Sequence, residues 1–79
     1  MNRIEVTGLL AYLDRLGLLA FKPGMEDAWF DVVSHLSADD AMTAARRLAA
    51  QDLPDGRFVA RPGDVIDAVG AIRRERIRA

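Results

Sequence analysis

Apolar residues recur at helical spacing in four separate stretches, which together fill most of this 79-residue chain. Residues three and four positions apart lie on one face of an α-helix, so each stretch predicts a helix with one apolar stripe. Helices of this kind bury their stripes by packing together. We therefore expect an all-α fold, a compact four-helix domain with short loops and one longer loop before the last helix.

The ends of the predicted helices carry residues that suit helix termini. Asn2 is placed to cap the first helix, and Glu5 three residues later completes a capping-box pattern. Gly17 suits the left-handed conformation that ends a helix, Ser37 is a good N-cap, and Pro62 suits a first helical position. We expect one domain spanning residues 1–79, with helices at about residues 3–16, 25–35, 38–51 and 62–77.

The expected core takes one stripe from each helix. The four stripes are Val6, Leu9, Leu10, Leu13 and Leu16; Met25, Ala28, Trp29, Val32, Val33 and Leu36; Ala41, Ala44, Ala45, Leu48 and Ala49; and Val65, Ile66, Val69 and Ile72. The third stripe is mostly alanine, which lets a neighbouring helix approach closely, and Trp29 is the bulky residue expected to fill the space against it. Between Asp52 and Arg61, Pro54-Asp55-Gly56 indicates a turn, and we expect Phe58 and Val59 to anchor this loop.

Size and composition restrict the class of protein. A chain of 79 residues has room for one small domain and little room for a deep cavity. It has no cysteine, so neither disulfides nor a thiolate zinc site supplement the core. No apolar run approaches the ~20 residues needed to span a bilayer, and the start of the chain does not resemble a signal peptide. We expect a soluble, cytoplasmic protein without contact to a membrane.

Groupings that carry chemistry are scarce in the sequence. There is one histidine, and we find no phosphate-cradling or metalloprotease motif. His35 falls near a predicted helix end, where an imidazole favours the helix dipole. The pairs Glu26-Asp27 and Asp39-Asp40 fall in predicted first turns, where the dipole favours anions. We therefore expect a protein that is not an enzyme, with no catalytic residue, cofactor or metal site.

Charge is spread unevenly along the chain, although the formal net charge is only -1. Residues 25–40 hold five acids and no arginine or lysine, whereas residues 57–79 hold six arginines and three acids. The densest run contains Arg73, Arg74, Arg76 and Arg78, and guanidinium groups bind phosphate and carboxylate bidentately. The alternative is that cations near a helix C-terminus simply stabilise the helix.

Phe30 is a candidate apolar anchor for a partner. It lies about 100° further round the second helix than Trp29, away from the main stripe. Either the connector formed by Leu18 to Phe21 packs over it, or it is partly exposed.

The order of landmarks resembles a known family. A leucine-rich first helix is followed by a connector with Phe21 and Pro23, a helix centred on Trp29, and an alanine- and arginine-containing helix from Ala41 to Arg47. After a loop with Phe58, a final helix opens with Pro62 and ends in arginines. This arrangement resembles the N-terminal domain of phage replicative-helicase loaders of the loader-and-inhibitor type, as in small proteins of actinobacterial phages.

The resemblance implies a replication protein that contacts the replicative helicase or its loading machinery. Such loaders have a further, flexible C-terminal segment used for helicase engagement, whereas this sequence stops at Ala79. This departure puts loading activity in doubt, and we expect a domain that can still bind, block or dimerise. Our leading hypothesis is a non-enzymatic phage-type interaction module that uses Arg73, Arg74, Arg76 and Arg78, with Phe30 as an apolar anchor. Two alternatives are a small DNA-binding regulator that uses the same arginines, and a homodimer that pairs Leu18, Leu19, Phe21 and Phe30 across a two-fold axis.

Overall fold

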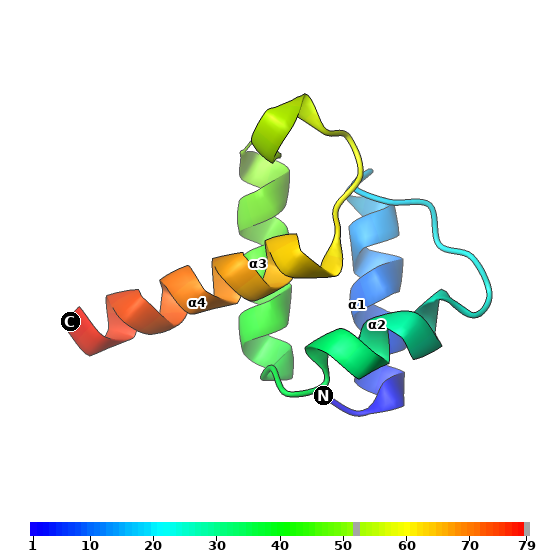
Figure 1. Cartoon of the computed structure of the whole chain (residues 1–79), viewed down its shortest axis with the longest axis horizontal. Helices are drawn as coiled ribbons and strands as arrows, with labels where there is room; N and C mark the ends of the chain where they lie inside the picture. The colour runs from blue at the N-terminus through cyan, green and yellow to red at the C-terminus, as the bar shows by residue number, and fades with distance from the viewer. Residues whose placement is uncertain (52, 79) are drawn as a thin grey trace.

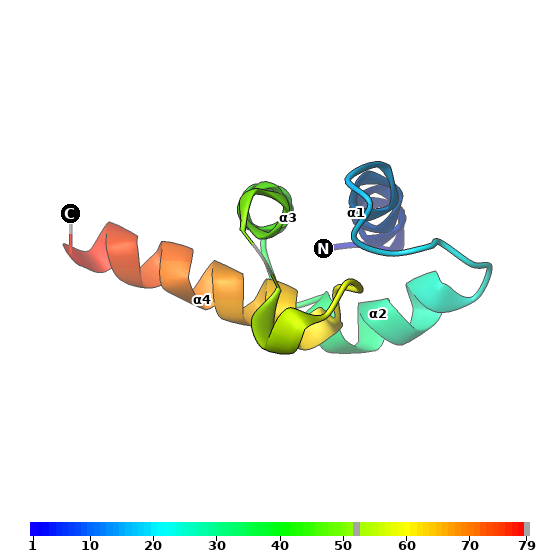
Figure 2. The same ribbon diagram turned by 90° about the horizontal axis from the view of Figure 1, so that it is seen from above.

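Four helices in two crossed layers make up the fold. The computed structural model describes residues 1–51 and 53–78. Its elements are α1 (Arg3–Arg15), α2 (Met25–Val33), α3 (Ala38–Ala50), the short 3-10 helix η1 (Pro54–Gly56) and α4 (Pro62–Arg78). In Figure 2, α1 and α3 lie side by side in one layer, and α2 and α4 lie in the other. The all-α, four-helix prediction is confirmed, and each helix agrees with its predicted range to within two residues.

The N-terminal caps form as the sequence predicts. The Asn2 side chain accepts a hydrogen bond from the Glu5 backbone N–H at 2.8 Å, and the Glu5 carboxylate accepts one from the Asn2 N–H at 2.9 Å. The Ser37 hydroxyl accepts from the Asp40 N–H at 3.2 Å, and α4 begins at Pro62. Gly17 has a φ of 78°, the left-handed conformation that lets the chain leave α1. The Asn2 and Ser37 side chains thus satisfy backbone N–H groups that have no partner within their helices.

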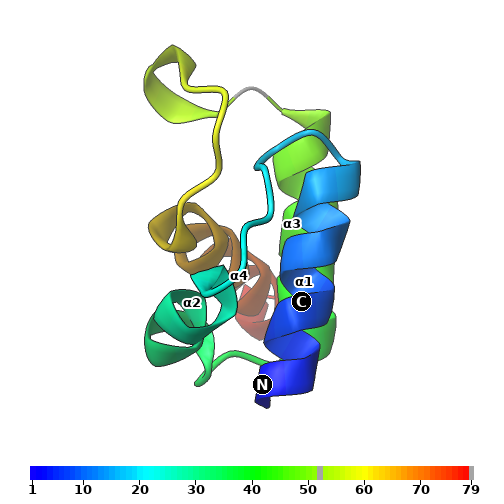
Figure 3. The ribbon, with the colours of Figure 1, turned by 90° about the vertical axis from the view of Figure 1, so that its right-hand side faces the viewer.

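The core lies between the two layers. Each helix contributes buried residues, namely Val6, Leu9, Leu10 and Leu13 of α1, Trp29 and Val33 of α2, Ala41, Ala44 and Ala45 of α3, and Val65, Val69 and Ile72 of α4. α3 packs against α1 and α4, and α2 also packs against α1 and α4. Trp29 is therefore a core residue, as expected, but the helices that lie against the alanine face of α3 are α1 and α4. Figure 3 shows α1 and α3 on one side of the molecule and α2 and α4 on the other.

Several predicted core positions are wrong. Ala28 and Ala49 are exposed, and Val32 is 44% exposed, because α2 and α3 each bury a narrower stripe than the periodicity suggested. Phe58 and Val59 do not anchor the loop before α4, since their side chains are 88% and 56% exposed.

Other groups hold this loop in place. Leu53 and Ala60 are buried among the described residues of this loop. The backbone N–H of Ala60 donates a 2.6 Å hydrogen bond to the Leu18 carbonyl, which ties the loop to the connector after α1. Asp55 at the predicted turn has a φ of 60°. Asp52, at the predicted start of the loop, lies outside the described residues.

The connector after α1 packs against the core. Leu19 is buried, while Leu18 and Phe21 are partly buried against the core, as is Phe30 of α2. These are the four residues that a homodimer was expected to pair, and the domain's own packing already covers much of their surface. Within residues 1–51 and 53–78, no helix is both long enough and apolar enough to cross a membrane.

Replacing Leu10 by alanine should destabilise the domain strongly. Leu10 is fully buried, and removing such a side chain costs about 2–5 kcal/mol because a cavity remains. Ile4 on the same helix is 83% exposed, so Ile4→Ala should change the free energy of unfolding by less than about 0.5 kcal/mol. Urea denaturation of both variants measures the difference. Equal losses in the two would contradict the placement of the core.

Candidate functional site

The C-terminal part of α4 extends beyond the core. Val65, Val69 and Ile72 are the buried apolar residues of this helix, and residues 73–78 are all exposed. Figure 1 shows α4 crossing α3 and continuing past it to the C-terminus. We call the segment from Arg73 to Arg78 the basic end. It contains Arg73, Arg74, Arg76 and Arg78, the four arginines predicted to bind a partner.

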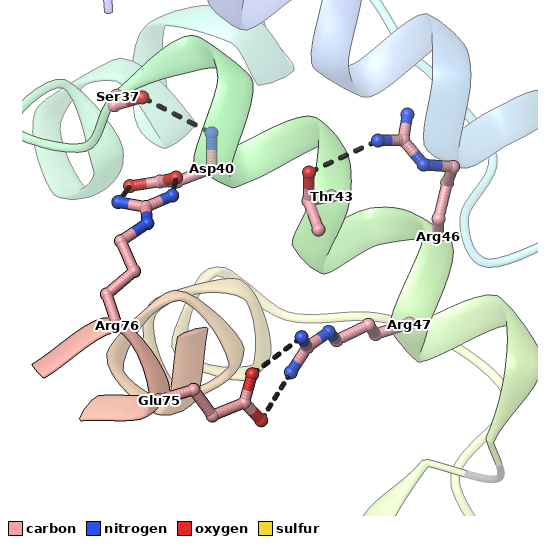
Figure 4. Close-up of polar contacts among 7 residues, drawn as sticks. All are labelled: Ser37, Asp40, Thr43, Arg46, Arg47, Glu75 and Arg76. Carbon is pink, nitrogen blue, oxygen red and sulfur yellow. Dashed lines mark hydrogen bonds and ion pairs between the residues drawn. The ribbon is translucent and has the colours of Figure 1, made fainter. Parts of the chain in front are cut away.

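Arg76 is bound to a carboxylate of α3. Its guanidinium donates two hydrogen bonds to Asp40, one of 3.2 Å from Nη1 to Oδ2 and a second from Nη2 to Oδ1 (Figure 4). The hydrogen bonds from Arg76 lower the pKa of Asp40, burial acts in the opposite direction, and the nearby charge of Arg73 lowers it slightly further. The same pair raises the pKa of Arg76. Arg76 therefore holds the basic end against the start of α3.

A second ion pair joins the same two helices, with its arginine on α3 and its carboxylate on α4. Arg47 of α3 donates two hydrogen bonds, of 2.9 and 2.7 Å, to the two carboxylate oxygens of Glu75 (Figure 4). These hydrogen bonds lower the pKa of Glu75 and raise that of Arg47. The two pairs join α3 to α4 on either side of the helix crossing. Among the described residues of α4, no apolar side chain beyond Ile72 is buried. The two ion pairs therefore fix the direction of the basic end.

Three arginines of the basic end form no ion pair with the described residues. These are Arg73, Arg74 and Arg78, and all three are exposed. The Nη1 atom of Arg74 lies back along the helix, 3.4 Å from the point that a Cβ atom would occupy at Gly70. Ile77 lies among these arginines and is 86% exposed. The basic end thus presents free guanidinium groups together with one large apolar side chain.

Phe30 lies apart from the arginines. In Figure 1, α2 lies on one side of α3 and the basic end on the other. The ring is partly buried against the core, and the guanidinium carbon of Arg3 lies 4.6 Å from its centroid. Arg3 also forms an ion pair with Asp27. The structure therefore does not bring Phe30 and the arginines into one site, and a cation–π contact covers part of the ring.

A second feature, in the loop before α4, was not predicted from the sequence. Asp64 accepts hydrogen bonds of 2.9 and 2.7 Å from Arg57 and one of 2.8 Å from the backbone N–H of Arg61. The hydrogen bonds from Arg57 are the main reason that the pKa of Asp64 is lowered. A surface hollow of about 410 Å³ is lined by Leu53, Gly56, Arg57 and Phe58. Periodicity gives no signal for the direction of loop side chains, so sequence reasoning missed the exposed Phe58.

His35 follows the end of α2 and is exposed. In the part of the chain that the structure describes, no three histidine, aspartate or glutamate side chains gather as a metal site would require. Comparison with protein-family models, with curated proteins and with solved structures found no match for this chain. The functional proposal therefore rests on the geometry of the chain's own residues.

Acid should destabilise the domain through its paired carboxylates. The pKa values of Asp40, Asp64 and Glu75 are lowered on folding from ordinary values of 3.8, 3.8 and 4.5. A lowered pKa contributes stability that is present above the unfolded value and is lost as the pH falls through the folded value. We expect the free energy of unfolding to fall steadily below about pH 5.

Arg57→Gln should reduce the loss of stability in acid, because the pKa of Asp64 would then lie closer to its ordinary value. Arg15→Gln is a matched control, since Arg15 is exposed and forms no ion pair with the described residues. Urea denaturation between neutral and acidic pH measures the slopes. Identical slopes for wild type and Arg57→Gln would contradict the role of this pair.

Proposed function

We propose that this domain is a non-enzymatic interaction module of the cytoplasm, whose basic end binds a protein of the DNA replication machinery. The observation that carries the proposal is the make-up of this surface. Arg73, Arg74 and Arg78 have no carboxylate partner among the described residues, and the exposed Ile77 lies among them. Arginine and large apolar side chains together are typical of protein-binding surfaces.

The anchoring of the basic end supports the same proposal. Two ion pairs to α3, Asp40–Arg76 and Arg47–Glu75, hold the helix that carries the binding residues. A surface held in place before binding loses less conformational entropy when a partner arrives. In this proposal Arg76 has a positioning role, and Arg73, Arg74 and Arg78 make the direct contacts.

The replicative helicase is the first partner to test. The order of helices and landmarks resembles phage helicase loaders of the loader-and-inhibitor type, as described from the sequence. A domain of this kind would bind the helicase or its loading machinery and direct or block loading onto DNA. The resemblance supplies the identity of the partner, and the basic end supplies the surface.

A DNA-binding regulator is the alternative, and the three unpaired arginines favour it. Against it, Asp40 of α3 binds Arg76 and neutralises its charge, which leaves one cation fewer for phosphate groups. Three phosphate contacts would give a slope of only about -3 in log affinity against log salt concentration. A steeper slope requires further contacts with DNA outside the basic end.

The proposal predicts that the triple variant Arg73→Ala, Arg74→Ala, Arg78→Ala binds a purified actinobacterial replicative helicase about tenfold more weakly than wild type, because exposed arginines at an interface centre carry much of the binding energy. Arg76 is left intact because it supports the fold. Biolayer interferometry with immobilised domain measures the affinity.

A second triple variant separates specific contacts from net charge. Arg15, Arg46 and Arg61 are exposed and lie outside the basic end, so changing all three to alanine removes the same charge. This control should bind the helicase nearly as well as wild type. Absence of helicase binding by the wild-type domain, or equal losses in the two triple variants, would contradict the proposal.

A further inference from the structure

The basic end already holds one carboxylate that a helix presents. Asp40 lies in the first turn of α3, and both of its oxygens accept hydrogen bonds from the Arg76 guanidinium (Figure 4). The Asp40 side chain is 9% exposed, whereas that of Arg76 is 62% exposed. Arg76 therefore keeps most of its surface open to solvent while it binds Asp40. The Asp40–Arg76 pair is thus an intramolecular example of an arginine of the basic end that binds a carboxylate on another helix.

The side of α4 that faces away from α3 is open to a second helix. At 100° per residue, Arg74 lies about 200° round the helix from the buried Ile72. Gly70, one turn earlier, presents no side chain, and a Cβ atom there would meet only the Arg74 guanidinium. That guanidinium ends a flexible side chain, so it is free to swing toward a ligand. An approaching helix would find no side chain at Gly70 and the flexible guanidinium group of Arg74 beside it.

The spacing of the exposed residues matches a particular kind of helix. Arg74 and Arg78 are one helical turn apart, which places their Cβ atoms about 5–6 Å from each other. Ile77 lies beside them and is 86% exposed. Carboxylates four residues apart on a partner helix match the two guanidinium groups, and an apolar residue next to them would cover Ile77. A nucleic-acid backbone would match the arginines but would leave Ile77 in water.

We infer that the face of the basic end formed by Arg74, Ile77 and Arg78 binds an acidic, amphipathic α-helix of a partner protein. The inference rests on the proposed function and names the chemistry of the partner segment. Arg76 lies about 200° round the helix from Arg74, on the side that binds Asp40, so it positions this face and does not contact the partner helix.

The probe is a fluorescein-labelled peptide of glutamate, alanine and leucine, with glutamates four residues apart. A length of about 20 residues exceeds the ~12–15 at which isolated helices are marginal. The comparison peptide has the same charge and carries interior prolines, which break the helix. Fluorescence anisotropy with the full chain should show about tenfold tighter binding of the helical peptide, because the disordered peptide must be ordered on binding.

Two pairs of variants test the residues. Arg74→Ala with Arg78→Ala should weaken helical-peptide binding about tenfold, since each guanidinium makes a charged hydrogen bond. Asp40→Asn should weaken binding severalfold, because it removes the ion pair that holds the basic end in place. Asp39→Asn is the matched control: it removes the same charge from the same turn of α3, but Asp39 pairs with no described arginine, so its effect should be clearly smaller. Circular dichroism monitors the helix content of each variant, and the Arg74 and Arg78 variant tests the surface without disturbing the contact with α3.

The outcomes separate this inference from the proposed function. Equal binding of the two peptides, equal effects of the Asp39 and Asp40 substitutions, or tighter binding of a duplex DNA of similar charge would overturn the inference. Helicase binding without helical-peptide binding would overturn it while leaving the proposed function standing. Peptide binding with the expected variant effects, but without helicase binding, would support the inference and reject the helicase as partner.

Discussion

The crossing of α3 and α4 is the contact on which the rest of the molecule depends. Ala41, Ala44 and Ala45 are fully buried, and their small side chains let the two helices approach closely. Larger residues at these positions would push α4 away from the layer formed by α1 and α3. The crossing also decides where α4 leaves the core, because its last buried residue is Ile72. Residues 73–78 beyond it are all exposed, so a packing constraint in the core creates the basic end.

Local features of the fold were predictable from the sequence, because each depends on a few neighbouring residues. The Asn2 and Glu5 capping box, the Ser37 cap and the start of α4 at Pro62 follow from short-range hydrogen bonding and from the fixed φ of proline. The exposure of Phe58 was not predictable in this way. Its position depends on hydrogen bonds that tie its loop to Leu18 and to Asp64. Periodicity within one segment contains no information about such contacts.

The candidate site likewise combines a feature that the sequence predicts with contacts that only the fold defines. The run of arginines is visible in the sequence, but their separate roles are not. Arg76 and Glu75 bind residues 36 and 28 positions earlier in the chain, so their partners depend on the helix crossing. Once these two pairs are known, the exposed arginines that remain are Arg73, Arg74 and Arg78. The functional proposal therefore rests on fewer cations than the sequence suggested, together with an exposed Ile77 whose environment only the fold defines.

Amide hydrogen exchange along α4, followed by NMR, tests the central claim most directly. If the crossing with α3 fixes the helix and ion pairs alone support its end, amides from Ile66 to Ile72 should exchange only through global unfolding. Amides of the basic end should exchange faster, through local opening, and added salt should speed them further because it screens the ion pairs. Equal protection along the whole helix, or exchange at the basic end that does not respond to salt, would contradict this account.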